Sequence, residues 1–116
     1  MTAINFKKQF ADFVESGVKT QTIRKIRKRP IRIGDTLQLY TGMRTKKCRK
    51  LRTAVAIDVK TIVIDQNTVI VDGNQIDFDE LEKLAIADGF HSICEFKGFF
   101  NSRYGIPFVG QLIKWK

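Results

Sequence analysis

The chain is predicted to form one α+β domain, a small and mainly antiparallel β-barrel with flanking helices. Its 116 residues are enough for one hydrophobic core and too few for a second. Short runs rich in β-branched residues fill the middle of the chain, and helical periodicity appears near its beginning and near its end. Strands interrupted by helices in this order are typical of a small barrel with helices packed outside it. We therefore treat 1–116 as a single domain.

The first predicted element is a helix between Asn5, a suitable N-cap, and Gly17, a suitable C′ residue. Its apolar side chains recur at helical spacing and would form one docking stripe, made of Phe6, Phe10, Phe13 and Val14. After it, Thr20–Arg24 alternates weakly, which indicates a short strand. The basic connector Lys25–Arg29, closed by Pro30, is predicted to be a mobile loop.

The middle of the chain is predicted to be an antiparallel meander. A turn at Gly34 and Asp35 leads into a strand that buries Leu37 and Leu39 on one face. Three further strands follow, each separated from the next by turn residues: Thr53–Ile64, Val69–Val71 and Asn74–Ile76.

Two helices and a final strand complete the predicted domain. Asp77 and Glu80 have the spacing of a capping box, and Ser92 and Glu95 repeat it. The second of these helices carries its apolar residues on one side, at Ile93, Phe96, Phe99 and Phe100. A last strand is expected at Val109–Trp115.

Positive charge is concentrated in one stretch of the chain. From Lys19 to Arg52 there are thirteen Lys or Arg residues and one acid, Asp35, a local charge of +12 against +9 for the whole chain. Such a field predicts a polyanionic partner, and RNA is ranked above DNA because no helix-turn-helix or zinc pattern is present. Two basic runs flank one predicted strand pair and are expected to converge on the partner: Arg24, Lys25, Arg27, Lys28, Arg29 and Arg32, then Arg44, Lys46, Lys47, Arg49 and Lys50. Tyr40 either stacks on a base or packs against the first helix.

Several classes of protein are excluded by what the sequence lacks. No apolar run approaches the roughly 20 residues of a membrane helix, and the N-terminus has no signal pattern. We therefore expect no membrane partner and a cytoplasmic location. Cys48 and Cys94 lack a CxxC partner, and His91 is the single histidine, so neither a metal, a cofactor nor a disulfide is expected. The sequence does not predict an oligomeric state.

The order of motifs resembles the ASCH family of PUA-like β-barrels over nearly the whole chain. Three groups of residues carry the resemblance: Gly17, Lys19 and Arg24 in a G-x-K-x-x-x-x-R core, Ile31, Gly34, Asp35 and Leu37 in the strand after it, and Phe90, Ser92, Glu95 and Phe96 in the late helix. The resemblance implies a cleft between barrel and helices, lined by the lysine and arginine of the core, that receives a nucleotide or nucleic acid. Some small ASCH proteins remove the acetyl group from 4-acetylcytidine with a lysine, a threonine and a glutamate. Lys19 and Thr22 match the first two, and the position that best corresponds to the glutamate holds the shorter Asp88.

The chemistry of these residue types agrees in part with an enzyme. A desolvated Lys19 near Arg24 would be a neutral amine, able to take the hydroxyl proton of Thr22 as that oxygen attacks an amide carbonyl. Residues three apart on a strand face opposite sides, so the two can meet only if Lys19 precedes the strand or a bulge intervenes. Otherwise Lys19 is a solvated strand-start residue and Thr22 a β-former. The sequence thus leaves open a binding module, an amidohydrolase and a ribonuclease.

Overall fold

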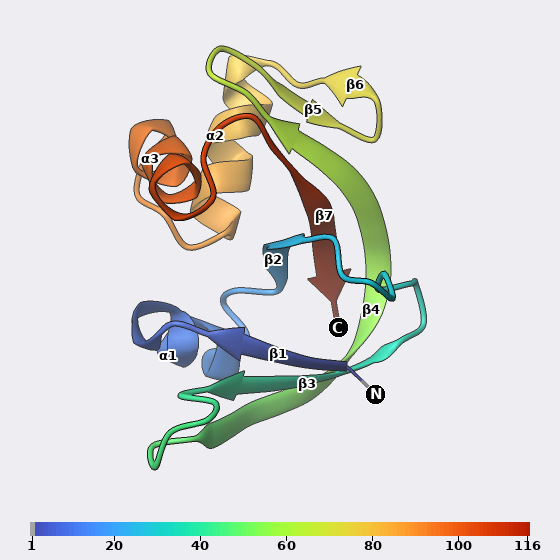
Figure 1. The fold of residues 1–116 in the computed structure, drawn as a ribbon, viewed down its shortest axis with the longest axis vertical. Coiled ribbons are helices and arrows are strands. Elements are labelled where there is room, and N and C mark those ends of the chain that lie inside the picture. Colours follow the sequence, from blue (N-terminus) through green and yellow to red (C-terminus); the bar gives the residue numbers. More distant parts are fainter. Residues whose placement is uncertain (1) are drawn as a thin grey trace.

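The computed structural model describes residues 2–116, so only residue 1 of the predicted domain lies outside the described part. These residues form three helices and a seven-stranded mixed sheet that is not closed. The sheet curves along one side of the molecule, and the helices lie on the side toward which it curves (Figure 1). In chain order the elements are β1 (Thr2–Phe6), α1 (Lys8–Ser16), β2 (Gln21–Lys25), β3 (Thr36–Thr41), β4 (Arg49–Ile64), β5 (Val69–Val71), β6 (Asn74–Gln75), α2 (Phe78–Ala87), α3 (Ile93–Arg103) and β7 (Phe108–Trp115).

The long strand β4 organises the sheet. Its first half pairs with β3, and its second half pairs with β7 and β5. The pairing of β1 with β3 is parallel, and every other pairing is antiparallel, so the sheet is mainly antiparallel as predicted. Within the described residues β1 pairs only with β3, and β2 pairs only with β7. A closed barrel is therefore not what the strand pairing shows, and a gap remains between β1 and β2.

The N-terminal prediction was wrong in several respects. Phe6, expected on the first helix, ends β1, where it and Ile4 alternate with exposed Asn5. The helix begins later, and its N-cap is Lys7, whose side chain makes no capping hydrogen bond. Phe13 lies 46% exposed and is not part of the docking face. The strand was missed because its partner, β3, lies more than thirty residues away and local periodicity carries no trace of it.

Most of the other predicted elements are confirmed. Asp77 accepts a hydrogen bond from the Glu80 N–H and Ser92 one from the Glu95 N–H, each at the start of its helix. β4 starts at Arg49, four residues before the predicted Thr53. The basic residues Arg49, Lys50 and Arg52 are exposed there, while Leu51 between them is buried.

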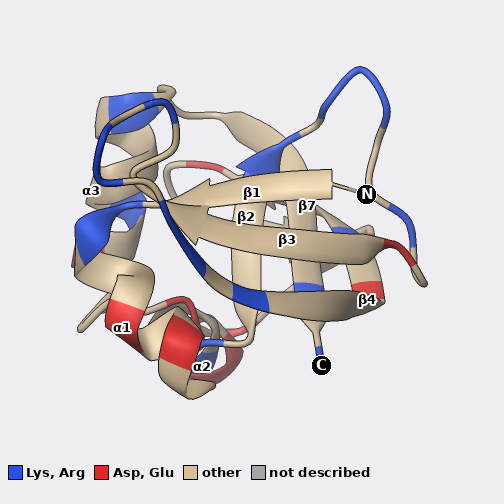
Figure 2. Cartoon of the chain, turned by 90° about the horizontal axis from the view of Figure 1, so that it is seen from below, with Lys and Arg blue, Asp and Glu red and all other residues tan. Residues whose placement is uncertain are grey.

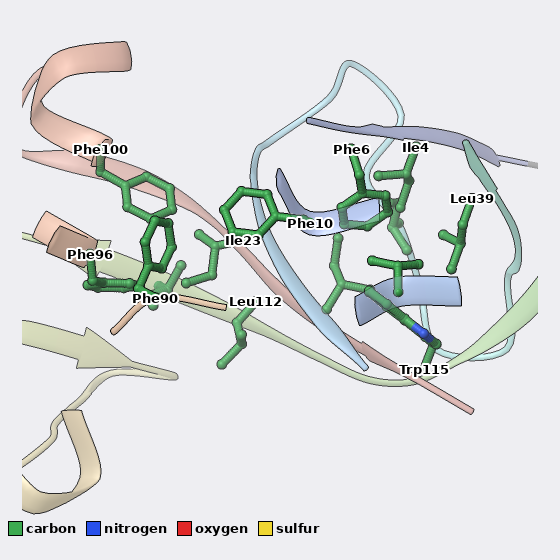
Figure 3. Packing of buried hydrophobic residues seen from close by; sticks show 14 of the residues in the cluster. Ile4, Phe6, Phe10, Ile23, Leu39, Phe90, Phe96, Phe100, Leu112 and Trp115 are labelled. Atoms are coloured by element: carbon green, nitrogen blue, oxygen red, sulfur yellow. The ribbon is translucent and has the colours of Figure 1, made fainter. Parts of the chain in front are cut away.

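The core runs from the sheet to the two later helices. Phe6 contacts Trp115 of β7 edge to face, with ring centroids 5.8 Å apart (Figure 3). At the other end Phe90, between α2 and α3, contacts Phe96 and Phe100. Phe10 of α1 lies between these groups and meets Phe90 at 5.4 Å (Figure 3). α1 is thereby fixed against both the sheet and the aromatic cluster of α3.

Candidate functional site

A pocket of about 140 Å³ lies where the sheet fails to close. Its walls come from the end of β1, from β2, and from the segments that end α2 and α3. It is lined by Asn5, Phe6, Lys7, Phe10, Lys19, Thr22, Ile23, Arg24, Asp88, Phe90, Phe99, Phe100, Arg103 and Tyr104. Segments at opposite ends of the chain therefore meet around one cavity, and the predicted residues Lys19, Thr22, Arg24 and Asp88 all line it.

Lys19 is one of the few charged side chains buried in the described structure, with 3% of its surface exposed. It precedes β2, which begins at Gln21, so it can lie on the same side as Thr22 without a bulge. Its ammonium donates to the backbone oxygen of Asp88 at 2.6 Å and to the carboxylate Oδ1 at 3.1 Å. The ring of Phe10 lies beneath it, 5.2 Å from Nζ to the centroid. Two hydrogen bonds to Asp88 and the ring of Phe10 therefore hold the ammonium of Lys19 in place.

Asp88 is the partner that fixes this arrangement. It caps the end of α2, where the chain turns at Gly89, and its carboxylate is buried. Gln21 also donates to Oδ1, at 3.4 Å. Burial raises the pKa of Asp88 above its usual value, although Lys19 and Gln21 oppose that shift. Burial likewise lowers the pKa of Lys19, against the attraction of Asp88. Both shifts act against the charged forms, and the contact between the two side chains at 3.1 Å offsets them in part.

Thr22 and Arg24 form the second half of the site. Their side chains point to one side of β2 because they are two residues apart, and Arg24 Nε donates to Thr22 Oγ1 at 3.0 Å. The guanidinium lies over the ring of Phe6, 4.8 Å from its centroid. Burial lowers the pKa of Arg24 to about 10, so it stays cationic at neutral pH. It presents positive charge to anything that enters the pocket.

Apart from Arg24, the predicted basic residues do not line this pocket. The two runs lie at opposite ends of β3, the first before it and the second after it, so the predicted convergence was wrong (Figure 1). Arg27 reaches β1 and donates to the Ala3 oxygen at 2.7 Å, and Arg49 pairs with Glu15 at 2.6 Å. The remaining predicted cations all lie on the exposed surface: Lys25, Lys28, Arg29, Arg32, Arg44, Lys46, Lys47 and Lys50. The two basic runs do not converge because β3 separates the segments that carry them.

The aromatic rim of the pocket differs from the prediction. Tyr40 lies on β3 opposite Asn5 and Lys50 and does not line the pocket. Tyr104, which sequence reasoning missed, lies at the end of α3, 40% exposed and 4.8 Å from the ring of Phe108. Its neighbour Arg103 donates to the Tyr104 hydroxyl at 3.1 Å. The available signal was the position of Tyr104, one helical turn beyond Phe100 on the aromatic side of α3.

The site contains no obvious place for a metal. Among residues 2–116 no group of three or more His, Cys, Asp or Glu side chains lies close enough to hold an ion. Cys48 and Cys94 are free and exposed. His91 is exposed and does not line the pocket. In this part of the chain there is also no helix long and apolar enough to cross a membrane.

Comparison of the chain with protein-family models, curated proteins and solved structures finds no match. The function has to be argued from the pocket itself.

Proposed function

We propose that this chain is a PUA-like domain of the ASCH type that binds RNA, or a nucleotide derived from it, by taking a base into the pocket between β1 and β2. One observation carries the proposal. Lys19 and Arg24 of the core motif, together with Thr22, line the same cavity as the rings of Phe99 and Tyr104. Hydrogen-bonding groups next to aromatic faces are what an unstacked base requires.

The size of the pocket favours a base over a larger ligand. Sites for whole small molecules usually measure about 300–1,000 Å³. The pocket has about 140 Å³, enough for an aromatic ring and its polar substituents. A bound nucleotide would thus keep its ribose and phosphates outside the pocket, near the exposed Lys7 at its rim. The net charge of +9 favours such an anionic ligand, and the proposal keeps the cytoplasmic location expected from the sequence.

The proposal is tested by calorimetric titration with ribonucleoside 5′-monophosphates. Replacing Arg24 by Gln removes a charge and the hydrogen bond to Thr22, so affinity should fall about tenfold or more. The matched control is Arg32→Gln, which removes an exposed charge away from the pocket and should leave the affinity unchanged. Equal losses in both variants, or no binding by the parent protein, would contradict a base-binding pocket.

An amidohydrolase is the second candidate, favoured by the convergence of Lys19, Thr22 and Asp88 on one cavity. Thr22 Oγ would attack the acetyl carbonyl of a substrate such as 4-acetylcytidine as a neutral Lys19 takes the hydroxyl proton. The amide C–N bond then breaks, and the leaving cytosine amine receives that proton from Lys19. Water next cleaves the acetyl ester on Thr22 and releases acetate. The lowered pKa of Lys19, caused by burial, supports the first step, and Arg24 would stabilise the oxyanion.

Liquid chromatography of 4-acetylcytidine incubated with the protein tests this candidate. If it is correct, Thr22→Val and Lys19→Met each abolish turnover, and the double variant is no worse than either, because members of one catalytic unit are non-additive. If the parent is inactive, Asp88→Glu restores the length of the family's carboxylate and should confer activity. A well-folded Asp88→Glu variant without turnover would count against the amidohydrolase. Gel analysis of an RNA strand after the same incubation tests the ribonuclease alternative.

A further inference from the structure

A second hollow, of about 570 Å³, lies directly beside the pocket. We call it the basic groove. It runs between the start of α1 and the loop after β3, and it is lined by Asn5, Phe6, Lys7, Lys8, Ala11, Asp12, Thr41, Gly42, Met43, Thr45, Lys47 and Arg49. Asn5, Phe6 and Lys7 line both the groove and the pocket. The two hollows thus meet at the end of β1.

The basic groove is lined by mostly positive charge. Lys7, Lys8, Lys47 and Arg49 line it against one acid, Asp12. Arg49 is already paired with Glu15, so the argument rests on the lysines. Figure 2 shows Lys and Arg gathered on the loop after β3 and at the start of α1, with Asp and Glu on later turns of α1 and on α2. Lys7, Lys8 and Lys47 are exposed and can reach an anion without losing much hydration.

Local hydrogen bonds hold the wall of the groove in place. Asn5 Oδ1 accepts from the Met43 N–H at 3.0 Å, which ties the loop after β3 to the rim of the pocket. Within the loop, Thr45 Oγ1 donates to the Gly42 oxygen at 2.6 Å and accepts from the Lys47 N–H at 3.1 Å. A side chain at Gly42 would meet the Lys47 oxygen at 2.8 Å, so the loop folds closely on itself. This preformed turn therefore presents Lys47 to the groove.

We propose that the ligand is a single strand of RNA whose base enters the pocket and whose adjoining nucleotides lie in the basic groove, with phosphates at Lys8 and Lys47. This rests on the proposed function and extends it, because a free nucleoside would leave the groove empty. The pocket is too small for ribose and phosphate, and the groove is the adjoining hollow with positive charge. The groove also explains the basic run after β3, which the pocket does not use.

The test is fluorescence anisotropy with a labelled single-stranded RNA of about a dozen nucleotides, within the range of lengths that single-strand binders cover. Affinity is measured over a series of salt concentrations. Each phosphate contact contributes about −0.7 to the slope of log K against log salt, so Lys8→Gln with Lys47→Gln should make the slope shallower by about 1.4. The control is Lys83→Gln with Lys114→Gln, which removes two charges from a separate hollow beside α2 and should leave the slope unchanged. Equal changes in both pairs would overturn the inference.

Mononucleotides separate failure of the inference from failure of the proposed function. A ribonucleoside 5′-monophosphate places its base in the pocket and has no adjoining nucleotides to lie in the groove, so the lysine pair in the groove should change its affinity less than twofold. Arg24→Gln should weaken the binding of both the mononucleotide and the RNA. If mononucleotide binding depends on Arg24 while RNA binds no more tightly and ignores Lys8 and Lys47, the groove is not a subsite and the pocket proposal stands. If neither ligand depends on Arg24, the proposed function itself fails.

Discussion

Lys19 and Asp88 form a buried ion pair, which is costly to maintain. Both are buried, with 3% and 6% of their side-chain surface exposed, and their charges lie 3.1 Å apart. Taking two charges from water costs several kcal/mol each, and their attraction repays this only with good geometry and further hydrogen bonds. A protein selected for stability alone would do as well with an apolar pair. The ion pair is therefore more readily explained by the pocket that it lines than by the core.

A double-mutant cycle tests that view. Lys19→Met leaves a buried carboxylate without its partner and should cost roughly 3–5 kcal/mol of unfolding free energy. Lys19→Met combined with Asp88→Asn removes both charges, so its cost should fall below the sum of the single changes by about 0.5–3 kcal/mol. Urea denaturation at neutral pH measures all three variants. Strict additivity would show that the pair does not interact in solution.

Asp88 also predicts a particular dependence of stability on pH. Its pKa is raised by burial above the ordinary 3.8, so in a window above that value the folded protein holds a proton that the unfolded chain has released. The stability that this group contributes is complete below pH 3.8 and is lost as pH rises through the folded-state pKa. The unfolding free energy of the parent minus that of Asp88→Asn should decrease from about pH 4 to neutrality. A difference that grows over this range would mean that Lys19 outweighs burial.

At the scale of single residues, the sequence predicts which residues lie at the centre of the candidate site better than which lie at its rim. Lys19, Thr22 and Arg24 lie within one short segment, so local spacing was enough to group them. Asp88 was found only through the resemblance, because the turn after α2 reaches Lys19 across 69 residues. Tyr104 could not be assigned, since whether an aromatic side chain lines a pocket depends on the packing of distant elements. Tyr40, for which the sequence left two roles open, does not line the pocket.

At the scale of elements, the two phenylalanines of α1 show that burial decides how much an apolar side chain contributes to stability. Phe10 is 7% exposed and packs against Phe90, while Phe13 on the same helix is 46% exposed. Phe10→Ala should cost roughly 3–5 kcal/mol. Phe13→Ala is the matched control and should change the stability by less than about 1 kcal/mol. Thermal and urea unfolding give both values, and similar losses in the two variants would show that α1 is docked in another orientation.

The contact between β2 and β7 positions Arg24 and can be tested through a glycine. A side chain at Gly110 would strike the backbone oxygen of Arg24 and, at 2.8 Å, the ring of Phe108. Backbone cannot move aside, so Gly110→Ala should destabilise the protein by about 1–3 kcal/mol and weaken ligand binding. Gly98 of α3 has open space around it, so Gly98→Ala should instead stabilise by roughly 0.5–1 kcal/mol. A Gly110→Ala variant with parental stability would place β2 farther from β7.

Elements are predictable where their signals are local. The N-caps of α2 and α3, and the alternation of buried and less buried residues in β3, each depend on a few neighbouring residues. Each of these features was predicted correctly. β1 was missed, and its last residue Phe6 was assigned to the helix, because Phe6 and Phe10 fit a helical spacing by coincidence. Its five residues become a strand through parallel pairing with β3, a contact that periodicity cannot reveal. The early start of β4 likewise depends on pairing with β3.

At the scale of the molecule, the gap in the sheet produces the pocket. β4 bends through a register shift between Ala56 and Asp58, and the sheet curls until β1 and β2 approach without pairing. α1 and the ends of α2 and α3 cover the gap and supply its aromatic and acidic lining. The sequence predicts a barrel with helices packed outside it, and its local patterns do not reveal that β1 and β2 stay unpaired. That failure to close is what leaves room for a ligand.

The central claim, that a base enters this gap, is tested most directly by nuclear magnetic resonance. The amide signals of the labelled protein are followed while ribonucleoside 5′-monophosphates, and separately 4-acetylcytidine, are added. We predict that the largest shifts fall on Thr22, Arg24 and Tyr104, and that Arg24→Gln abolishes them. Shifts centred instead on the hollow at Lys83 and Lys114, or no shifts with any of these ligands, would contradict the account.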